Sequence, residues 1–334
     1  MVGARQPGRK IDNSFHKFER LADATLLEEY YIPTGNDKFM ALTTRPALTQ
    51  ADMAKIIAET TTLVSLPSVC VKINELIERN NYTAAEIGSI ISKDANLTGR
   101  LLHVANSAFY GFAAKINTVS RAVTIIGSRE LRDLILATSA VEAFNKIPID
   151  MANMNSFWMH SLDCAIIARI LAGRAKILHS ERLFVCGMLH DVGHLVMYLK
   201  LPERAREAML HAAKTHQYIE TAEREIIGFD HAQLGGALLR AWQLPENVSE
   251  TVHYHHDPFA APNFKLEATI IFLANTLAKA SRIGGTLSHT TESDQRAWTA
   301  LNLSPGEAPQ ILQEAKQQFA EALSVFLPHL AQAQ

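Results

Sequence analysis

The apolar residues of this chain recur every three to four positions from about residue 50 to residue 285. In YTAAEIGSII, Ile87 and Ile91 lie on one apolar stripe, and Thr83 with Glu86 forms the pattern of a helical capping box before it. Strands would require sustained alternation with a period of two and tight glycine turns, and these signals are missing. The sequence therefore predicts an all-α fold.

The organisation of the chain follows from where this periodicity starts and stops. Residues 1–45 are polar and interrupted by prolines, so we expect a tail or arm there. A domain over residues 50–285 divides at the segment IPIDM into a helical subdomain, residues 50–147, and a second bundle, residues 152–285. Residues 286–334 end in an amphipathic helix and predict a C-terminal helical extension. In the second bundle and its surroundings the pattern predicts helices around residues 155–173, 181–199, 203–216, 219–228, 231–242, 246–255 and 266–283.

Composition limits the partners and the compartment. The net charge of −2 at pH 7 gives no general attraction to nucleic acid, and 48% hydrophobic with 20% charged residues is typical of a folded soluble protein. Three widely spaced cysteines in apolar context suit a reducing compartment. The chain lacks both an apolar run of about 18 residues and the apolar region of a signal peptide. We therefore expect a cytoplasmic protein that does not bind membranes.

Histidines are concentrated in the second bundle. The segment MLHDVGHL places the pair His190–Asp191 inside an apolar run, where a buried carboxylate needs a cation or several hydrogen-bond donors. Imidazoles and carboxylates from separate helices are also what a water-activating metal site requires. The candidate partners of the pair are His160, His231, His255 and His256, and the glycines that would let helices approach closely are Gly187, Gly193, Gly235 and Gly236. The residues alone leave a metal site and a hydrogen-bonded core as equal alternatives.

Several longer motifs occur in a specific order. The first half contains LPSVCVKINELI, ISKDANLTGRLLHVANSAFYG and INTVSRAVTIIGSRELRDLIL. The second half contains FWMHS, GMLHDVGHLVMY, EIIGFDHAQLGGALLRAWQLPENV and HYHHDP. In this order, over roughly residues 55–285, they resemble an HDOD domain, a regulatory relative of the HD and HD-GYP metal-dependent phosphohydrolases. The resemblance implies an N-terminal helical subdomain packed on an HD-type helical bundle.

The resemblance also assigns expected roles to single residues. In catalytic HD-GYP relatives a centre of two or three metal ions hydrolyses cyclic di-GMP. Six residues fall where those relatives keep metal ligands: His160, His190, Asp191, His231, His255 and His256. Three other positions depart from the catalytic pattern, since a lysine is replaced by His194, a late carboxylate by Asn275 and an early glutamate by Ser156. The Gly-Tyr-Pro segment after the paired histidines is absent as well.

Each departure weakens phosphodiester hydrolysis. A neutral amide is a poor ligand for a hard divalent cation, and a histidine near neutral pH carries its charge only part of the time. We therefore expect no catalytic residue, with His194 and Asn275 as vestiges of the catalytic set. We also expect at most one divalent transition-metal ion, for which iron, zinc, nickel and manganese all fit a nitrogen-rich site.

The function that the resemblance favours is signal transduction. The HDOD domain would act as an output domain that binds signalling or regulatory proteins and does not catalyse a reaction. Two alternatives stay open: a metal-dependent phosphohydrolase acting on a nucleotide or cyclic dinucleotide with the six matched residues, and a non-catalytic sensor of such a nucleotide-type ligand. A homo-oligomer is also compatible with the sequence.

Overall fold

The computed structural model describes residues 46–64, 67–79, 81–107, 115–146, 149, 151–178, 180–282 and 291–331. The tail expected over residues 1–45 lies outside the described residues. Within these ranges the regular elements are α-helices and two short 3₁₀ helices, without a strand, which confirms the predicted all-α class.

The first six described helices are α2 (Gln50–Leu63), α3 (Ser68–Glu78), α4 (Ala84–Ile91), α5 (Ala95–Ala105), α6 (Val119–Ile126) and α7 (Ser128–Asn145). The predicted capping box of α4 is confirmed, because the Thr83 N–H donates to the Glu86 carboxylate at 2.7 Å and the Glu86 N–H donates to the Thr83 hydroxyl at 3.2 Å. Thr49 and Asp52 close α2 in the same way. Such caps satisfy N–H groups that the first helical turn leaves without partners.

The bundle is built from α8 (Met154–Arg174), α9 (Ser180–Leu189), α10 (Val192–Lys200), α11 (Pro202–Thr215), α12 (Ile219–Ile226), α13 (His231–Ala241), α14 (Glu246–His253) and α15 (Lys265–Arg282). After η1 (Pro258–Ala260) and α15 follow α16 (Glu292–Ala300), η2 (Pro305–Glu307), α17 (Ala308–Phe326) and α18 (Pro328–Ala331).

One predicted helix was wrong. The sequence predicted a continuous helix over residues 181–199, whereas the structure breaks it between Leu189 and Val192. Asp191 leaves the helical conformation, with φ −96° and ψ 6°, and becomes the first flanking residue of α10. The break lies at the His190–Asp191 pair, so both side chains are presented from a turn and not from the face of a helix.

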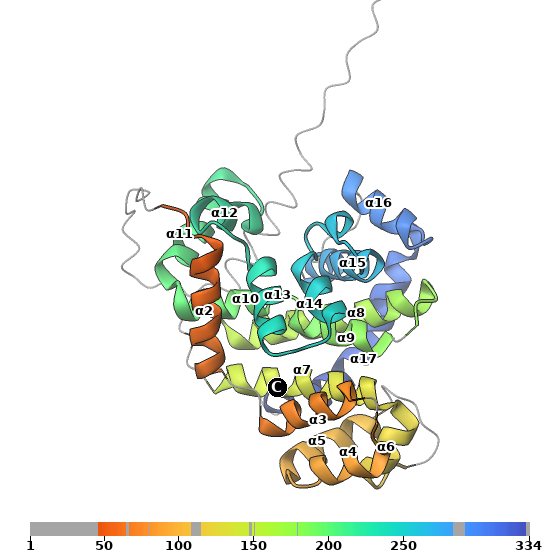
Figure 1. The fold of residues 1–334 in the computed structure, drawn as a ribbon. Coiled ribbons are helices and arrows are strands. Elements are labelled where there is room, and N and C mark those ends of the chain that lie inside the picture. The colour runs from red at the N-terminus through yellow and green to blue at the C-terminus, as the bar shows by residue number, and fades with distance from the viewer. Residues whose placement is uncertain are drawn as a thin grey trace, which may run out of the picture.

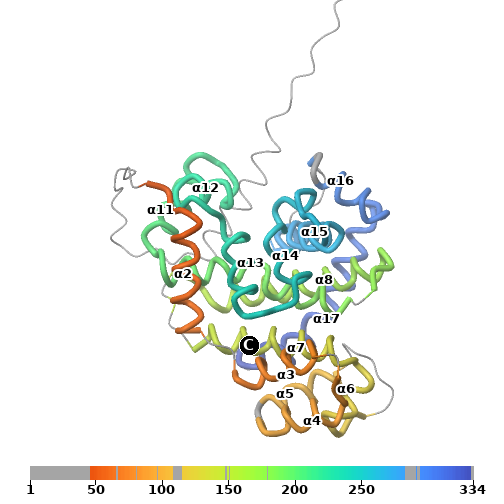
Figure 2. Tube along the Cα trace, in the orientation of Figure 1, coloured from red at the N-terminus to blue at the C-terminus, as the bar shows by residue number. Residues whose placement is uncertain are grey.

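The centre of the fold is α8, which is buried along most of its length and contacts α9, α15 and α17 (Figure 1). Figure 2 shows α3 to α6 gathered beyond α7 at one end, while α2 runs beside α13. One hydrophobic core extends through all these helices, from Met53 to Leu330. The long helix α17 is part of this core, since Phe326 packs on Phe184 with ring centroids 4.6 Å apart.

Glycines permit the closest helix crossings, as the sequence predicted. A Cβ atom at Gly193 would lie 1.9 Å from the His231 carbonyl oxygen, so α10 and α13 are in backbone contact there. A Cβ at Gly187 would lie 2.5 Å from the Ala165 Cα, so α9 and α8 also approach at the level of their backbones. These crossings draw the turn at residues 190–191 toward the start of α13 and toward α8.

The described residues contain no single helix that is long and apolar enough to cross a membrane; α2 and α3, bent by 114°, pass such a test only as a pair, by length and composition.

Candidate metal centre

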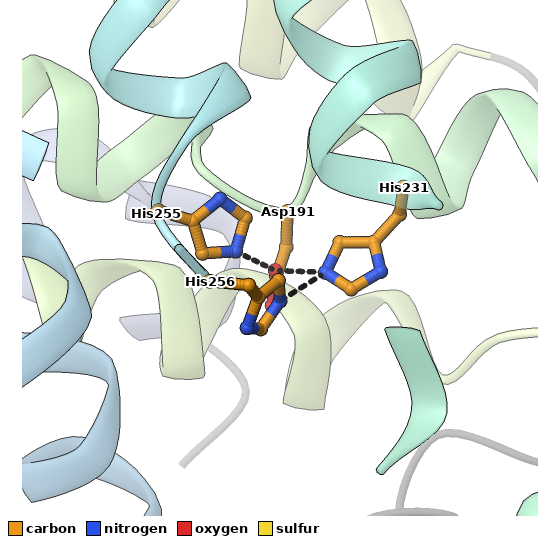
Figure 3. A group of neighbouring side chains, drawn as sticks. All are labelled: Asp191, His231, His255 and His256. Atoms are coloured by element: carbon orange, nitrogen blue, oxygen red, sulfur yellow. Dashed lines mark hydrogen bonds and ion pairs between the residues drawn. The ribbon is translucent and has the colours of Figure 1, made fainter. Parts of the chain in front are cut away.

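Four separate parts of the bundle supply the centre. The contributing residues are His160 on α8, His190 and Asp191 between α9 and α10, His231 at the start of α13, and His255 and His256 just after α14. The structure brings all six predicted ligands together, although their binding of a metal stays a prediction. Figure 3 shows three of the imidazoles turned toward Asp191 and toward one another.

Asp191 lies at the middle of the cluster. Its Oδ2 is 3.1 Å from His190 Nε2 and 3.7 Å from His160 Nε2. Its Oδ1 is 3.3 Å from His231 Nε2 and 3.6 Å from His255 Nε2. All four imidazoles are at most 1% exposed, and Asp191 is 8% exposed. The Nε2 atoms of four imidazoles therefore surround the buried Asp191 carboxylate.

The sixth residue, His256, completes one of three overlapping groups of candidate ligands. Its Nε2 lies 2.8 Å from the Nε2 of His231. The candidate ligand atoms of Asp191, His231, His255 and His256 all lie within 4.8 Å of one another, as do those of His160, His190 and Asp191. These two groups share Asp191, so an ion at this carboxylate has several nitrogens within reach. The third group, His194, Glu223 and His231, overlaps the first through His231.

The opposite ring nitrogens determine what these imidazoles offer. His190 Nδ1–H donates to the Gly187 carbonyl at 2.8 Å, and His255 Nδ1–H donates to the Val252 carbonyl at 2.7 Å. A carbonyl can only accept, so both protons are held at Nδ1 and each neutral ring presents a lone pair from Nε2. Both Nε2 atoms are buried, and among the described residues the Asp191 carboxylate is what they approach, without a well-directed hydrogen bond. Lone pairs aimed at a carboxylate need a cation between them, so these residues fit a metal ion.

In the absence of a metal ion, a proton on one of the imidazoles supplies part of the positive charge that the Asp191 carboxylate requires. Burial opposes a charge on His190, but the adjacent Asp191 carboxylate raises the pKa of His190 well above its ordinary value. Burial and the neighbouring His190 instead hold the pKa of His255 well below its ordinary value. The pKa of Asp191 is far below its usual range, because His190 and His231 outweigh the effect of burial. The metal-free centre thus stabilises a carboxylate–imidazolium pair.

Glu223 on α12 is a site residue that the sequence analysis missed. Its Oε2 accepts from the His231 backbone N–H at 2.9 Å and from His231 Nδ1–H at 2.6 Å. Burial would raise the pKa of Glu223, but His231 and His194 lower it far below its usual range. A carboxylate behind a histidine orients the ring and makes its other nitrogen a better ligand. The sequence feature that could have identified Glu223 is its position four residues after Ile219, on the apolar side of a short helix.

The two vestigial candidates both lie in the centre, as hydrogen-bonding or stacking partners of ligand candidates. His194 Nδ1 is 3.1 Å from Glu223 Oε1, and its ring stacks on His231 with centroids 3.7 Å apart. Asn275 on α15 accepts through Oδ1 from His160 Nε2–H at 3.1 Å. Ser156, where the resemblance expects a glutamate, lies one turn before His160, and its N–H donates to the Asn153 side chain that caps α8.

The donor set is rich in nitrogen. Imidazoles with one carboxylate suit a single borderline transition-metal ion, whereas hydrolytic two-metal sites hold ions about 3.5–4 Å apart. Here the Nε2 atoms share the Asp191 carboxylate, while Glu220 and Glu223 approach the Nδ1 atoms of His256 and His231. The chemistry of the residues therefore fits one ion better than two.

Comparison with known proteins gives a consistent picture. The HDOD domain family model matches residues 63–258. A curated protein from Treponema pallidum, named only as uncharacterized, is 27% identical over 215 residues, which cover 64% of this chain and 41% of that protein. The chain thus spans less than half the length of this relative.

Three solved structures share the fold. A provisionally named phosphohydrolase from Shewanella amazonensis is 21% identical, with a TM-score of 0.64, and the match covers 84% of this chain and 98% of that one. An HDOD domain protein of unknown function from Geobacter sulfurreducens is 23% identical, with a TM-score of 0.58 and coverages of 85% and 98%. A provisionally named signal transduction protein from Marinobacter aquaeolei is 18% identical, with a TM-score of 0.62 and coverages of 97% and 68%.

Proposed function

Because the chain belongs to the HDOD domain family, we propose that it is a cytoplasmic signal-transduction protein that acts by binding protein partners and not by catalysis. The observation that carries this proposal is the single shared carboxylate of the centre. Four Nε2 atoms approach Asp191 within 3.7 Å, and α15 offers the neutral Asn275 at 3.1 Å from His160.

This arrangement disfavours phosphodiester hydrolysis for two physical reasons. A second divalent ion would add charge for which Asn275 contributes no carboxylate, and the Glu223 carboxylate is already engaged by His231 and His194. His194 occupies the position of the lysine expected in catalytic relatives, and it contacts Glu223 and stacks on His231. The His194 ring therefore packs within the histidine cluster and is not positioned as a cation for a phosphate oxygen.

A bound ion would have a structural role in this proposal. His190, Asp191, His231 and His255 would hold it, and it would supply the positive charge that their lone pairs and the carboxylate require. Iron, zinc, nickel and manganese suit such a nitrogen-rich set. Because the four residues come from three separate segments, the ion would fasten α13 and the turn after α14 to the break between α9 and α10.

Metal content and turnover test the proposal together. We expect elemental analysis of the purified chain to find at most one transition-metal ion per molecule. We also expect no linear product when the chain is loaded with manganese or iron and incubated with cyclic di-GMP. Turnover at around one per second, an ordinary enzymatic rate, would overturn the non-catalytic proposal.

The variant Asp191→Ala is the matched blank for that assay, because it removes the carboxylate shared by all four Nε2 atoms. Product formed equally by the chain and by this variant comes from a contaminating enzyme. Binding of cyclic di-GMP without turnover, lost in the same variant, would favour the sensor over the partner-binding protein.

A further inference from the structure

A second polar cavity lies away from the metal centre. It has a volume of about 230 Å³ and is situated between α3 and α7 on one side and α9 and α14 on the other. Arg129, Arg132 and Arg182 all line it. It shares no lining residue with the histidine cluster, so it is a separate feature of the fold.

Arg132 is already neutralised. It is 5% exposed, and its Nε donates to the Asp133 carboxylate at 2.9 Å. Its Nη1 also lies 3.6 Å from Glu78 and donates to the Asn74 side-chain oxygen at 3.5 Å. These partners balance one guanidinium group of the cavity.

The guanidinium groups of Arg129 and Arg182 differ from that of Arg132 in their ion pairing. Among the described residues, neither Arg129 nor Arg182 forms an ion pair, and Arg182 Nε is buried without a hydrogen-bond partner. Burial raises the pKa of Asp133, and both Arg132 and Arg182 act against that rise, but the hydrogen bond of this carboxylate goes to Arg132. A buried guanidinium donor without an acceptor is costly unless a ligand or water supplies one.

The remaining acids that line the cavity are Glu78 and Glu130. The Glu78 side chain is 70% exposed and lies nearest to Arg132. The Glu130 carboxylate lies against Gly127 at the start of α7. Within the described part of the chain, Arg129 and Arg182 therefore line the cavity without an ion pair to any of these acids.

Two helices also begin at this cavity. α7 starts at Ser128, and its flanking Gly127 provides no side-chain cap. α14 starts at Glu246 after Pro245, likewise without a side-chain cap. The N-terminus of a helix carries uncapped N–H groups and partial positive charge, which attract anions. Both helix starts therefore lie beside the arginines, and their first turns also carry the acids Glu130 and Glu246.

We propose that this cavity binds a small phosphate-bearing ligand, with Arg129 and Arg182 as its main counter-charges. Guanidinium groups match phosphate oxygens in charge and geometry, and bind them with two hydrogen bonds at once. At about 30 Å³ per water molecule, a volume of about 230 Å³ accommodates a phosphate group together with a small organic part. The ligand would join α7 to the first turn of α9, whose last turn leads into His190 and Asp191.

The test is calorimetric titration of the full chain with inorganic phosphate, after chelator treatment and at constant ionic strength. We expect saturable binding that is at least tenfold weaker in Arg182→Ala and in Arg129→Ala. Arg129 is exposed, so its replacement leaves the fold intact even if Arg182→Ala does not fold. The matched control is Arg121→Ala, an exposed arginine on α6 outside the cavity, which should bind as the unchanged chain does.

Three results would overturn the proposal. One is the absence of saturable binding by the unchanged chain. Another is equal binding by Arg129→Ala and Arg121→Ala. The third is loss of phosphate binding in His256→Ala with retention in both cavity variants, because it would place the phosphate at the histidine cluster. None of these results depends on whether the chain is an enzyme, so the test is independent of the proposed function.

Discussion

Replacing Gly193 by alanine tests whether the crossing of α10 and α13 holds the metal centre together. The new Cβ would lie 1.9 Å from the His231 carbonyl oxygen and 2.8 Å from the Gly235 backbone nitrogen. Both are backbone atoms, so rotation of a side chain cannot relieve the overlap. The helices must separate by about 1.5 Å before the first distance returns to an ordinary contact near 3.4 Å.

The separation should have two measurable effects. Overpacking of this kind costs about 1–3 kcal/mol of unfolding free energy. Asp191 Oδ1 and His231 Nε2 are 3.3 Å apart across the same crossing, so the same movement disrupts their contact. We expect metal affinity to fall by roughly 10- to 100-fold, the usual effect of disturbing the support of a ligand. Urea unfolding of the chelator-treated chain and a zinc titration measure the two effects separately.

Gly99→Ala is the matched control for this substitution. Gly99 lies inside α5, and a Cβ there would meet no atom within 4 Å. The same chemical change should therefore stabilise the chain, by up to about 1 kcal/mol, because alanine favours the helix over glycine. If Gly193→Ala proves as stable as Gly99→Ala, or binds zinc as tightly as the unchanged chain, the reasoning from the close crossing is refuted.

Three further predictions concern buried acids and amides. Asp191→Ala should cost about 1–3 kcal/mol in the metal-free chain, since several imidazoles lose their partner; an unchanged melting temperature would contradict this. Asn275→Asp should lower the melting temperature with chelator and raise it with zinc, because a buried carboxylate beside His160 needs a cation; equal shifts in both buffers would refute it. Burial, only partly offset by Arg282, raises the pKa of Asp163 to about 6, so stability is lost as the pH rises through about 6. Asp163→Asn should therefore be more stable than the unchanged chain near pH 7.5, and urea unfolding should show that gain shrinking toward pH 4.

The helical class and several helix starts were predictable because they depend on local patterns. The Thr83–Glu86 capping box, for example, uses atoms only three residues apart. The break between α9 and α10 was not predictable, since the apolar pattern of Leu189, Val192 and Leu195 continues across it. The folded chain places this break beside the backbone contact of Gly193 with α13, a contact between residues far apart in the sequence.

The metal centre likewise contains residues that the sequence identified and one residue, Glu223, that it did not. Its six ligand candidates were found from the His–Asp pair and from the family resemblance, while Glu223 was missed. The helix IETAEREI carries glutamates at 220, 223 and 225, and nothing in their local sequence separates a buried one from a solvated one. The choice is made by His231, eight residues away, which supplies two donors to Glu223.

The packing of α15 and α17 on α8 has a consequence for where this chain can be divided. The family match ends at residue 258, before both helices begin. A fragment cut there would expose two apolar faces of α8 to water and would deprive His160 of Asn275. The segment that the family model matches is therefore shorter than the segment that shares one hydrophobic core with α8. A fusion joined at that boundary would need to bring its own apolar surface to cover α8.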